Sequence, residues 1–340
     1  VWQLVNTLVP TAALWWLIPK VAHGWAGLAL LPILSLLVLL SARSFALMHD
    51  CGHGTLFSNP WLNRSAGFGL GCLNAIPQYP WSRGHAFHHK HNGNWQLYRG
   101  PSNLLTKNAY LELSPKNQWI YRFIRHPLML FPGGFFYLII RPRLQLILGL
   151  YEFFAASVVQ LWKGAWRHPG SWWSWISTFK SSHWYTTGEA VDLLFNNLVV
   201  VCSWWLMAGW MGAGLFWISY SVVMTFSAAI FICIFVVQHN FKGSYAHGSD
   251  DWNYLQAAIS GSSNLILPPL LNWFSADIAF HSVHHLCERI PNYRLRQCHE
   301  ENLSLLGDCH YLKLSDIPSC FDYNIWDQQA NELIPAQKVA

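Results

Sequence analysis

The sequence predicts an all-α integral membrane protein whose four transmembrane helices form two hairpins. Apolar residues make up 53% of the 340-residue chain and charged residues only 11%, against roughly 25% charged in ordinary soluble domains. The chain also contains 21 Trp, 20 Phe and 13 Tyr, and such rings are enriched at bilayer interfaces. Mean hydropathy is positive, at +0.20. These observations exclude a disordered chain, a collagen and a secreted disulfide scaffold.

Four stretches are apolar over nearly the length that a helix needs to cross the hydrocarbon core, about 20 residues. They are Leu4–Ile18, Gly27–Ala42, Leu193–Trp210 and Leu215–Val237. Short turns separate the first two stretches from each other and the last two from each other, so each pair is predicted to form an antiparallel hairpin.

The two hairpins divide the chain into four parts, which are residues 1–48, 49–190, 191–238 and 239–340. Of the 21 lysines and arginines, only Lys20 lies on the outer side of the hairpins. Because positive charge is retained on the cytoplasmic side of membranes, the central segment and the C-terminal tail are both predicted to be cytoplasmic. We expect them to form a helical cap beneath the hairpins.

One part of the central segment, Leu128 to Leu150, is itself apolar but is interrupted by Pro132, Gly133, Gly134 and Pro142. We interpret it as interfacial or re-entrant pieces that lie on the cytoplasmic face. The alternative, that it forms a further hairpin through the membrane, stays open at this point.

Seventeen histidines are unusual in a chain with so few charged residues, and nine of them form a pattern. The first motif, HDCGH, has HxxxH spacing directly after the second predicted span. The second and third motifs, HAFHH and HSVHH, both have HxxHH spacing, and a further histidine follows the fourth span in the sequence QHN. The nine candidates for metal binding are His49, His53, His85, His88, His89, His239, His281, His284 and His285.

The spacing of these histidines suits two metal ions. Residues i and i+4 lie on one helix face with β-carbons about 5–6 Å apart, so two such imidazoles can bind one metal. The adjacent third histidine of each HxxHH motif points about 100° around the helix and can reach a second metal. Because the second and fourth spans run in the same direction, His49 and His239 emerge at one membrane face. The cap is therefore predicted to hold a di-metal site.

A single motif of this kind is more often structural than metal-binding, and it is the agreement of all four signals that favours metal. His91, beside the second motif, stays open as a candidate. We interpret the remaining histidines as structural or surface residues: His23, His126, His168, His183, His247, His299 and His310.

The donor set limits the choice of metal and partner. Neutral imidazoles with almost no thiolate suit iron, copper, nickel or zinc, but nine exceed the three protein ligands of a catalytic zinc site. Two metals at a membrane suggest O₂ activation.

The eight cysteines form no CxxC pair, which argues against a zinc ribbon or a redox dithiol. A net charge of only +5, without a basic stripe, does not predict a nucleic-acid partner.

The three histidine motifs resemble those of the membrane fatty acid desaturase family. The tail resembles bacterial and cyanobacterial acyl-lipid desaturases more specifically, through QHNF at 238–241 and RIPNYRL at 289–295. The resemblance covers about residues 25–305, which would form one desaturase domain. The histidine motifs alone are shared with alkane and carotenoid oxygenases, so only the sequence around them separates the desaturases.

This resemblance implies a non-haem di-iron centre with all nine histidines as iron ligands, O₂ as co-substrate and two electrons per turnover. The reaction would leave a cis double bond in a saturated acyl chain of a membrane lipid. A small soluble carrier, ferredoxin, would supply the electrons. Arg64, Arg83, Lys90 and Arg99 could dock an acidic carrier, or they could be ordinary charges of the cytoplasmic face.

Two aspartates are candidates for the surroundings of the metals. The family often has Asn four residues before the third motif, where this chain has Asp277. That carboxylate could bind iron or could orient an imidazole. We interpret Asp50, inside the first motif, as an acceptor that orients an imidazole, which is the common role of carboxylates near metal-bound histidine. Termination of a helix is the alternative role for Asp50.

Two other functions stay open. A methylene group has no acidic proton and no leaving group, so its oxidation requires a cofactor, and a related hydroxylase or ketolase would use the same metal site. A metal transporter or sensor would instead need ionisable groups deep in the spans. The polar pair found there, Asn196 and Asn197, is uncharged.

Overall fold

The computed structural model describes residues 1–100, 103–164 and 169–339, and most of these residues are helical. The longer helices are α1 (Trp2–Val21), α2 (Leu30–His53), α3 (Pro60–Leu73), α4 (Gln78–His91), α6 (Pro115–Ile124), α8 (Arg141–Trp162), α9 (Pro169–Thr178), α10 (Thr187–Met211), α11 (Ala213–Val237) and α15 (Asn292–Glu301). The shorter helices are α5 (Lys107–Leu111), α7 (Leu130–Phe135), α12 (Tyr254–Ser260), α13 (Pro269–Phe274), α14 (His281–Leu286) and α16 (Ile317–Cys320). The 3-10 helices are η1 (Gly24–Ala29), η2 (Pro127–Met129), η5 (Leu314–Asp316) and η6 (Ala336–Lys338), and η3 (Phe136–Ile140) is a π-helical segment.

Within the described residues, five helical stretches are long and apolar enough to cross a membrane. They are Trp2–Val21, Gly27–His53, Pro127–Trp162, Thr187–Met211 and Ala213–Val237. Four of them contain the four apolar stretches that the sequence predicts as spans. Their outer faces expose apolar side chains, among them Leu31, Trp205 and Ile218, as expected for surfaces that face lipid. The count of five goes beyond the predicted four, and the additional stretch contains Leu128–Leu150.

The Leu128–Leu150 stretch, expected as interfacial or re-entrant pieces, forms a continuous helical run, and its placement at the cytoplasmic face stays a prediction. η2, α7, η3 and α8 follow one another without a break. The π-helical turn of η3 directly precedes Pro142, which occupies one of the first two positions of α8, where a missing N–H is tolerated. Gly134 permits close packing, because a β-carbon there would lie only 2.7 Å from the β-carbon of Ala228 on α11. The proline and glycine signals thus mark a bend and a helix contact.

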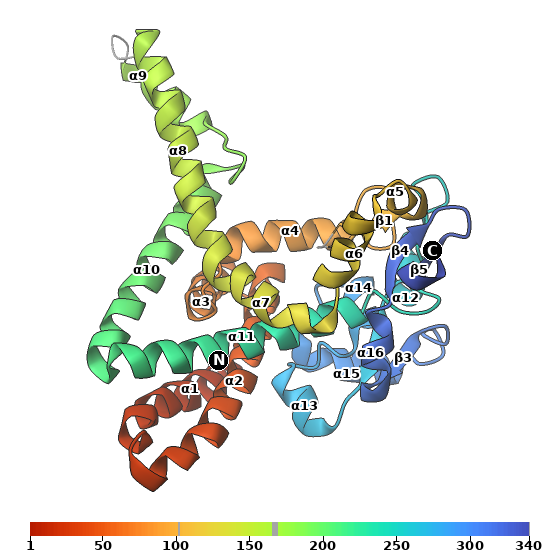
Figure 1. The fold of residues 1–340 in the computed structure, drawn as a ribbon, viewed down its shortest axis with the longest axis horizontal. Coiled ribbons are helices and arrows are strands. Elements are labelled where there is room, and N and C mark those ends of the chain that lie inside the picture. The colour runs from red at the N-terminus through yellow and green to blue at the C-terminus, as the bar shows by residue number, and fades with distance from the viewer. Residues whose placement is uncertain (101–102, 165–168, 340) are drawn as a thin grey trace.

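The helices that lead to the histidines pack against one another. α2 contacts α1, α3 and α11, and α11 runs from the α10 turn to the end of the molecule where the tail is folded (Figure 1). Buried apolar side chains such as Leu47, Met48 and Val223 fill the contact between α2 and α11. α8 extends away from the rest of the molecule and carries α9 at its far end (Figure 1). The C-terminal ends of α2 and α11 are thereby held close together.

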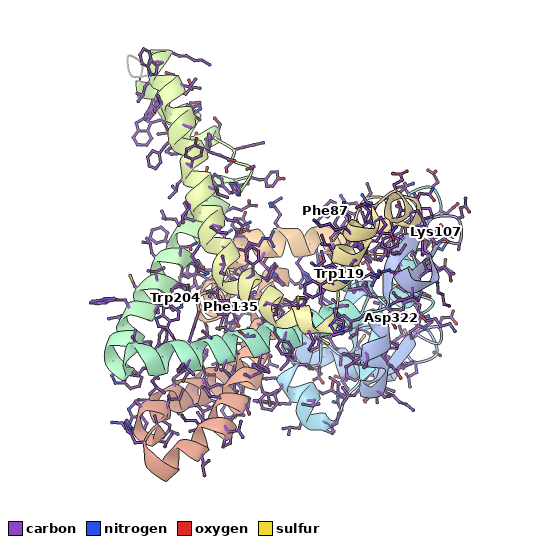
Figure 2. The ribbon with its side chains drawn as sticks, in the orientation of Figure 1. Phe87, Lys107, Trp119, Phe135, Trp204 and Asp322 are labelled. Carbon is purple, nitrogen blue, oxygen red and sulfur yellow. The ribbon has the colours of Figure 1, made fainter. Side chains whose placement is uncertain are left out.

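The cap is not purely helical, which corrects the all-α prediction. β1 (Leu105–Thr106), β4 (Tyr323–Asp327) and β5 (Glu332–Pro335) form a sheet in the order β1-β4-β5, parallel between β1 and β4 and antiparallel between β4 and β5. β2 (Ser263–Ile266) pairs in parallel with β3 (His310–Lys313). Strands this short have too few residues for a clear alternating pattern. Lys107, near the three-stranded sheet, lies at the opposite end of the view from Trp204 on α10 (Figure 2).

Candidate metal centre

The structure brings all nine candidate histidines together in two adjoining groups. In each group the potential ligand atoms lie within 4.8 Å of one another. Group one consists of His49, His53, His85, His89 and His284. Group two consists of His88, His239, His281 and His285. The groups touch, since the ring centroids of His89 and His285 are 4.3 Å apart.

The division between the groups follows the helical spacing of the motifs. His85 and His89, four residues apart on α4, both lie in group one, whereas His88 lies in group two. On α14 the assignment is reversed: His281 and His285 lie in group two and His284 in group one. Each HxxHH helix therefore presents imidazoles to both groups, as residues about 100° apart around a helix must.

The first motif belongs to the last turns of α2, which continues eleven residues beyond the predicted end at Ala42. Gly54 ends the helix with a φ of 73°, and its N–H donates to the carbonyls of Asp50 and Cys51. This left-handed residue is a common way to end a helix. His49 and His53 consequently share one face, with their Nε2 atoms 3.3 Å apart.

The second motif is positioned by a hydrogen bond at the start of α4 and by a ring contact at His85. Asp192 of α10 accepts a hydrogen bond from the backbone N–H of Tyr79 in the first turn of α4, where helical N–H groups lack partners within the helix. The ring of Trp81 stacks on His85 at a centroid distance of 4.8 Å. The Nε2 atoms of His85 and His89 lie 3.0 Å apart. α4 is thus tied to α10 at its start and carries its histidines toward group one and group two.

His239 and the third motif meet from two segments of the tail. His239 lies just after α11 and directs Nε2 to within 3.0 Å of His281 Nε2. α14 is fixed by a hydrogen bond from the backbone N–H of Ser282 to Asn264 Oδ1 and by one from the Tyr254 hydroxyl to the carbonyl of His285. These polar contacts are local to the tail and orient a helix of only six residues.

Two carboxylates contact the outer ring nitrogens of group one. Asp50 Oδ1 lies 3.2 Å from His49 Nδ1, and its Oδ2 accepts a hydrogen bond from the backbone N–H of Asn292. Glu288 Oε2 lies 3.3 Å from His53 Nδ1 and 3.8 Å from His89 Nδ1. The hydrogen bond with His53 lowers the pKa of Glu288, so this carboxylate is ionised near neutral pH. A carboxylate on Nδ1 favours the tautomer in which Nε2 is free to bind a metal.

The surroundings of group two are different. His239 Nδ1 lies 3.1 Å from the backbone carbonyl of Gly261. The Nδ1 atoms of His281 and His285 and both ring nitrogens of His88 are buried without a hydrogen-bond partner. Within residues 1–100, 103–164 and 169–339, no carboxylate is hydrogen-bonded or ion-paired to these four imidazoles. Buried polar atoms without partners are costly, and a metal ion at His88 Nε2 would satisfy that nitrogen.

Several imidazoles of both groups are held neutral, which is the form that binds metal. Burial, followed by the repulsion of neighbouring imidazoles, lowers the pKa of His89 and His284 well below 6.5. The same causes act on His281 and His285 in group two. Burial lowers the pKa of His239 to about 4, although its hydrogen bond with Gly261 acts in the opposite direction.

Asp277 lies in neither group, and the role expected for it beside the metals stays a prediction. It precedes α14 in a turn where Ala276 and Asp277 have φ values of 51° and 54°. Helical spacing therefore does not carry the residue onto the face that bears His281. Its carboxylate instead lies 3.4 Å from Arg296 Nη2.

Other predicted residues have local partners. His91 belongs to neither group and packs against Phe87 at a centroid distance of 4.4 Å. Arg83 forms an ion pair with the buried Glu189 of α10 and lies over the ring of Tyr185. Of the remaining histidines, His299 is buried and contacts the Tyr311 hydroxyl. His168 lies outside the described residues.

Glu288 is the residue of this centre that sequence reasoning missed. It follows the third motif by three residues, but a single acidic residue there carries no signal beyond its nearness to histidines. An open groove of about 520 Å³ lies beside this contact. Its lining includes His53, Thr55, Arg289 and Tyr293. Group one therefore borders a polar groove that is open to the surface.

Comparison with known proteins agrees with this centre. The family model for fatty acid desaturases matches residues 23–317. A fatty acid desaturase of Bacillus subtilis (strain 168) is 29% identical, with 98% of this chain and 84% of that protein covered. An sn-1 acyl-lipid omega-3 desaturase (ferredoxin) of Nostoc sp. (strain 36) is 23% identical, covering 85% and 69%. An sn-2 acyl-lipid omega-3 desaturase (ferredoxin), chloroplastic, of Arabidopsis thaliana is 25% identical, covering 77% and 52%. The family match spans most of the chain and all nine histidines, and the chain therefore belongs to the fatty acid desaturase family of oxidoreductases.

Proposed function

We propose that this protein introduces a cis double bond into a saturated acyl chain of a membrane lipid, using O₂ and two electrons at a di-iron centre. The observation that carries the proposal is the convergence of nine imidazoles in two adjoining groups, in a chain of this family. The relatives from Nostoc and Arabidopsis are named as acyl-lipid desaturases, which supports a lipid-linked substrate here.

The donor set fits two iron ions. Five imidazoles of group one and four of group two supply nitrogen ligands without any thiolate in either group, and imidazole suits iron. Bound iron would supply the activation of O₂ that removal of hydrogen from a methylene requires. In this proposal the nine histidines hold the metals, and Asp50 orients His49 through Nδ1.

Aromatic side chains of this chain would keep water from the reacting acyl carbon. Phe235 packs against His88 at a centroid distance of 4.9 Å and against His239 at 5.2 Å. Trp81 stacks on His85, and Phe45 packs against the ring of Trp81. In this proposal the acyl chain lies against these rings beside the histidines.

We further propose that the histidines lie on the cytoplasmic side and that four of the five candidate helices cross the membrane, as two hairpins. Three candidates lie between His89 and His239, yet His89 and His88 contact the tail histidines. An odd number of crossings would separate these residues across the bilayer, so one candidate cannot cross. α10 and α11 are joined through Gly212 alone and pack on each other, so we assign the non-crossing role to Pro127–Trp162.

For the electron donor we propose ferredoxin, the carrier that appears in the names of the Nostoc and Arabidopsis proteins. A small soluble carrier can approach the cap from the cytoplasm. Lys90 is exposed directly after the second motif, whereas Arg83 is engaged with Glu189. Lys90 is therefore the better placed of these two cations to contact an acidic carrier.

Lipid analysis tests the proposed function. The full chain is expressed in a host that supplies reduced ferredoxin, and fatty acid methyl esters are analysed by mass spectrometry with the bond position mapped. New double bonds in membrane acyl chains are expected. Hydroxyl or keto products would instead identify a related oxygenase, and unchanged lipids with metal uptake would identify a transporter or sensor.

A transport role receives no support from the polar pair of α10. Asn196 donates to the carbonyl of Ile76 and accepts from Arg143. Asn197 donates to the carbonyls of Leu193 and Pro142. Both side chains therefore serve to join helices to one another.

A further inference from the structure

The two imidazole groups differ in what holds their outer nitrogens. Group one is contacted by the carboxylates of Asp50 and Glu288. In group two, the contact to His239 Nδ1 is a backbone carbonyl, that of Gly261, and the Nδ1 atoms of His281 and His285 are buried without partners. A substitution can remove the side-chain carboxylates that contact group one, but it cannot remove the backbone carbonyl that contacts group two. The difference between the groups can therefore be tested by substitutions at group one.

Glu288 has the more unusual position of the two carboxylates. It lies in the segment after the third motif, while the imidazoles it contacts belong to the first and second motifs. The distance of 3.3 Å to His53 allows a hydrogen bond, and the distance of 3.8 Å to His89 allows an electrostatic attraction only. One side chain therefore connects the three segments that supply group one.

The surroundings of Glu288 make this contact important for metal retention. Its side chain is 44% exposed, and His53 lines the open groove next to Arg289. We therefore expect water and soluble chelators to approach group one from this groove, although the His53 side chain itself is only 5% exposed. The side chains of His88, His281 and His285 are buried, so group two is shielded from the same competition.

We propose that Glu288 is a positioning residue for group one alone. It holds His53, and more weakly His89, with the proton on Nδ1 and with Nε2 directed to the metal. This inference rests on the proposed di-iron function, which it deepens by making the two metal positions unequal in their dependence on the surrounding protein.

The test compares the full-length chain with Glu288→Ala, Glu288→Gln and a control, Glu301→Gln, each purified in detergent and loaded with ⁵⁷Fe. Glu301 lies on α15 and contacts Gln297 rather than an imidazole. Iron content is followed during dialysis against a chelator, the remaining iron is characterised by Mössbauer spectroscopy, and folding is followed by thermal unfolding.

Glu288→Ala is expected to weaken the binding of one of the two irons by about 10- to 100-fold, the usual effect of removing a partner of a metal-bound histidine. One Mössbauer component should disappear first while the other stays. Glu288→Gln should have a smaller effect, because the amide oxygen still accepts one hydrogen bond. Glu301→Gln should behave as the unchanged chain.

Equal loss of both irons, or full retention by Glu288→Ala in a chain that otherwise holds two irons, would overturn the inference and leave the proposed function standing. Loss of iron only in parallel with a lower unfolding temperature would show a structural role and would also overturn it. An unchanged chain that binds no iron at all would overturn the proposed di-iron function together with this inference. If Glu288→Ala does not fold, Glu288→Gln provides the same comparison.

Discussion

The two imidazole groups are built from the same residue type but from different surroundings. Group one contains five histidines, borders an open groove and is contacted by two carboxylates. Group two contains four histidines, all buried, with a backbone carbonyl on His239. Ligand type alone would make the two positions nearly equivalent. Burial and the partners of the outer nitrogens make them different.

The two groups keep their imidazoles in place in different ways. In group one, carboxylates contact the rings, Asp50 from the same helix as His49 and Glu288 from a distant segment, and each contact can be removed by a substitution. In group two, packing holds the rings: His88 is enclosed by Phe235 and Tyr98 at centroid distances of 4.9 and 5.0 Å. Group two should therefore resist changes in solvent that disturb group one.

The largest effect is expected from removing a member of group two. His285→Ala deletes an imidazole that lies 3.1 Å from His281 and adjoins His89 of group one, so it should abolish the unsaturated product. Fatty acid methyl ester analysis of the expressing host measures this effect. His23→Ala, at an exposed position before α2, is the control and should leave product formation unchanged. Product formation by His285→Ala would show that group two is not needed for the reaction.

A smaller effect is expected from Asp50→Asn in group one. The amide keeps the shape but can satisfy only one of the two contacts, to His49 and to the backbone N–H of Asn292. We expect metal affinity to fall by about 10- to 100-fold and stability to fall by about 1–3 kcal/mol because a buried donor loses its partner. Iron titration and thermal unfolding measure these effects. Loss of iron from both groups to the same extent would contradict the separation of the groups.

The metal-free protein should lose stability on acidification. The pKa of a histidine in an unfolded chain is about 6.5, and burial lowers the pKa of His239 to about 4 in the folded protein. The unfolded state then binds more protons between these values, so stability is fully present above about pH 6.5 and falls as the pH decreases toward 4. The pKa shift of His239 alone corresponds to a contribution on the order of 3 kcal/mol to the free energy of unfolding.

This effect is measured by the unfolding temperature of the metal-free chain between pH 8 and pH 5. This range includes the pKa of a histidine in an unfolded chain, about 6.5. A variant lacking the titrating group, His239→Gln, should show a weaker pH dependence. A constant or rising unfolding temperature on acidification would contradict the prediction that buried neutral imidazoles dominate the response.

The smallest effect is expected far from both groups. Lys107 Nζ lies 2.7 Å from Asp327 Oδ2 at the edge of the three-stranded sheet, and the Lys107 side chain is 41% exposed. Because exposed ion pairs contribute at most about 1 kcal/mol, Lys107→Ala should change the unfolding temperature slightly and leave iron content unchanged. Loss of iron from this variant would show that the sheet takes part in holding the metal centre.

Much of the metal centre follows from local sequence patterns. The HxxHH spacing predicts that His85 and His89 lie together while His88 turns to a second position, and the structure has this arrangement. The four apolar stretches predict the helices that contain them, because their length and composition are properties of single segments. The family resemblance also rests on contiguous motifs, and the match over residues 23–317 confirms it.

Other features depended on contacts between distant segments. Asp277 looked suitable by its distance from His281 along the chain, but a left-handed turn directs it to Arg296. Pro132 and Pro142 looked like interruptions, yet a π-helical turn lets one helical stretch pass through them. The local sequence does not predict how neighbouring turns accommodate this aspartate and these prolines.

The sequence by itself determined the membrane class, the helices of the four predicted spans and the nine histidines, because hydropathy and helical periodicity act within one segment. Only the tertiary structure decided that Glu288 contacts imidazoles of two earlier motifs and that the Gly261 carbonyl meets His239. These contacts join residues far apart in the chain, and their formation depends on how the helices and the tail pack. Packing also decides which imidazoles face the groove and which are enclosed.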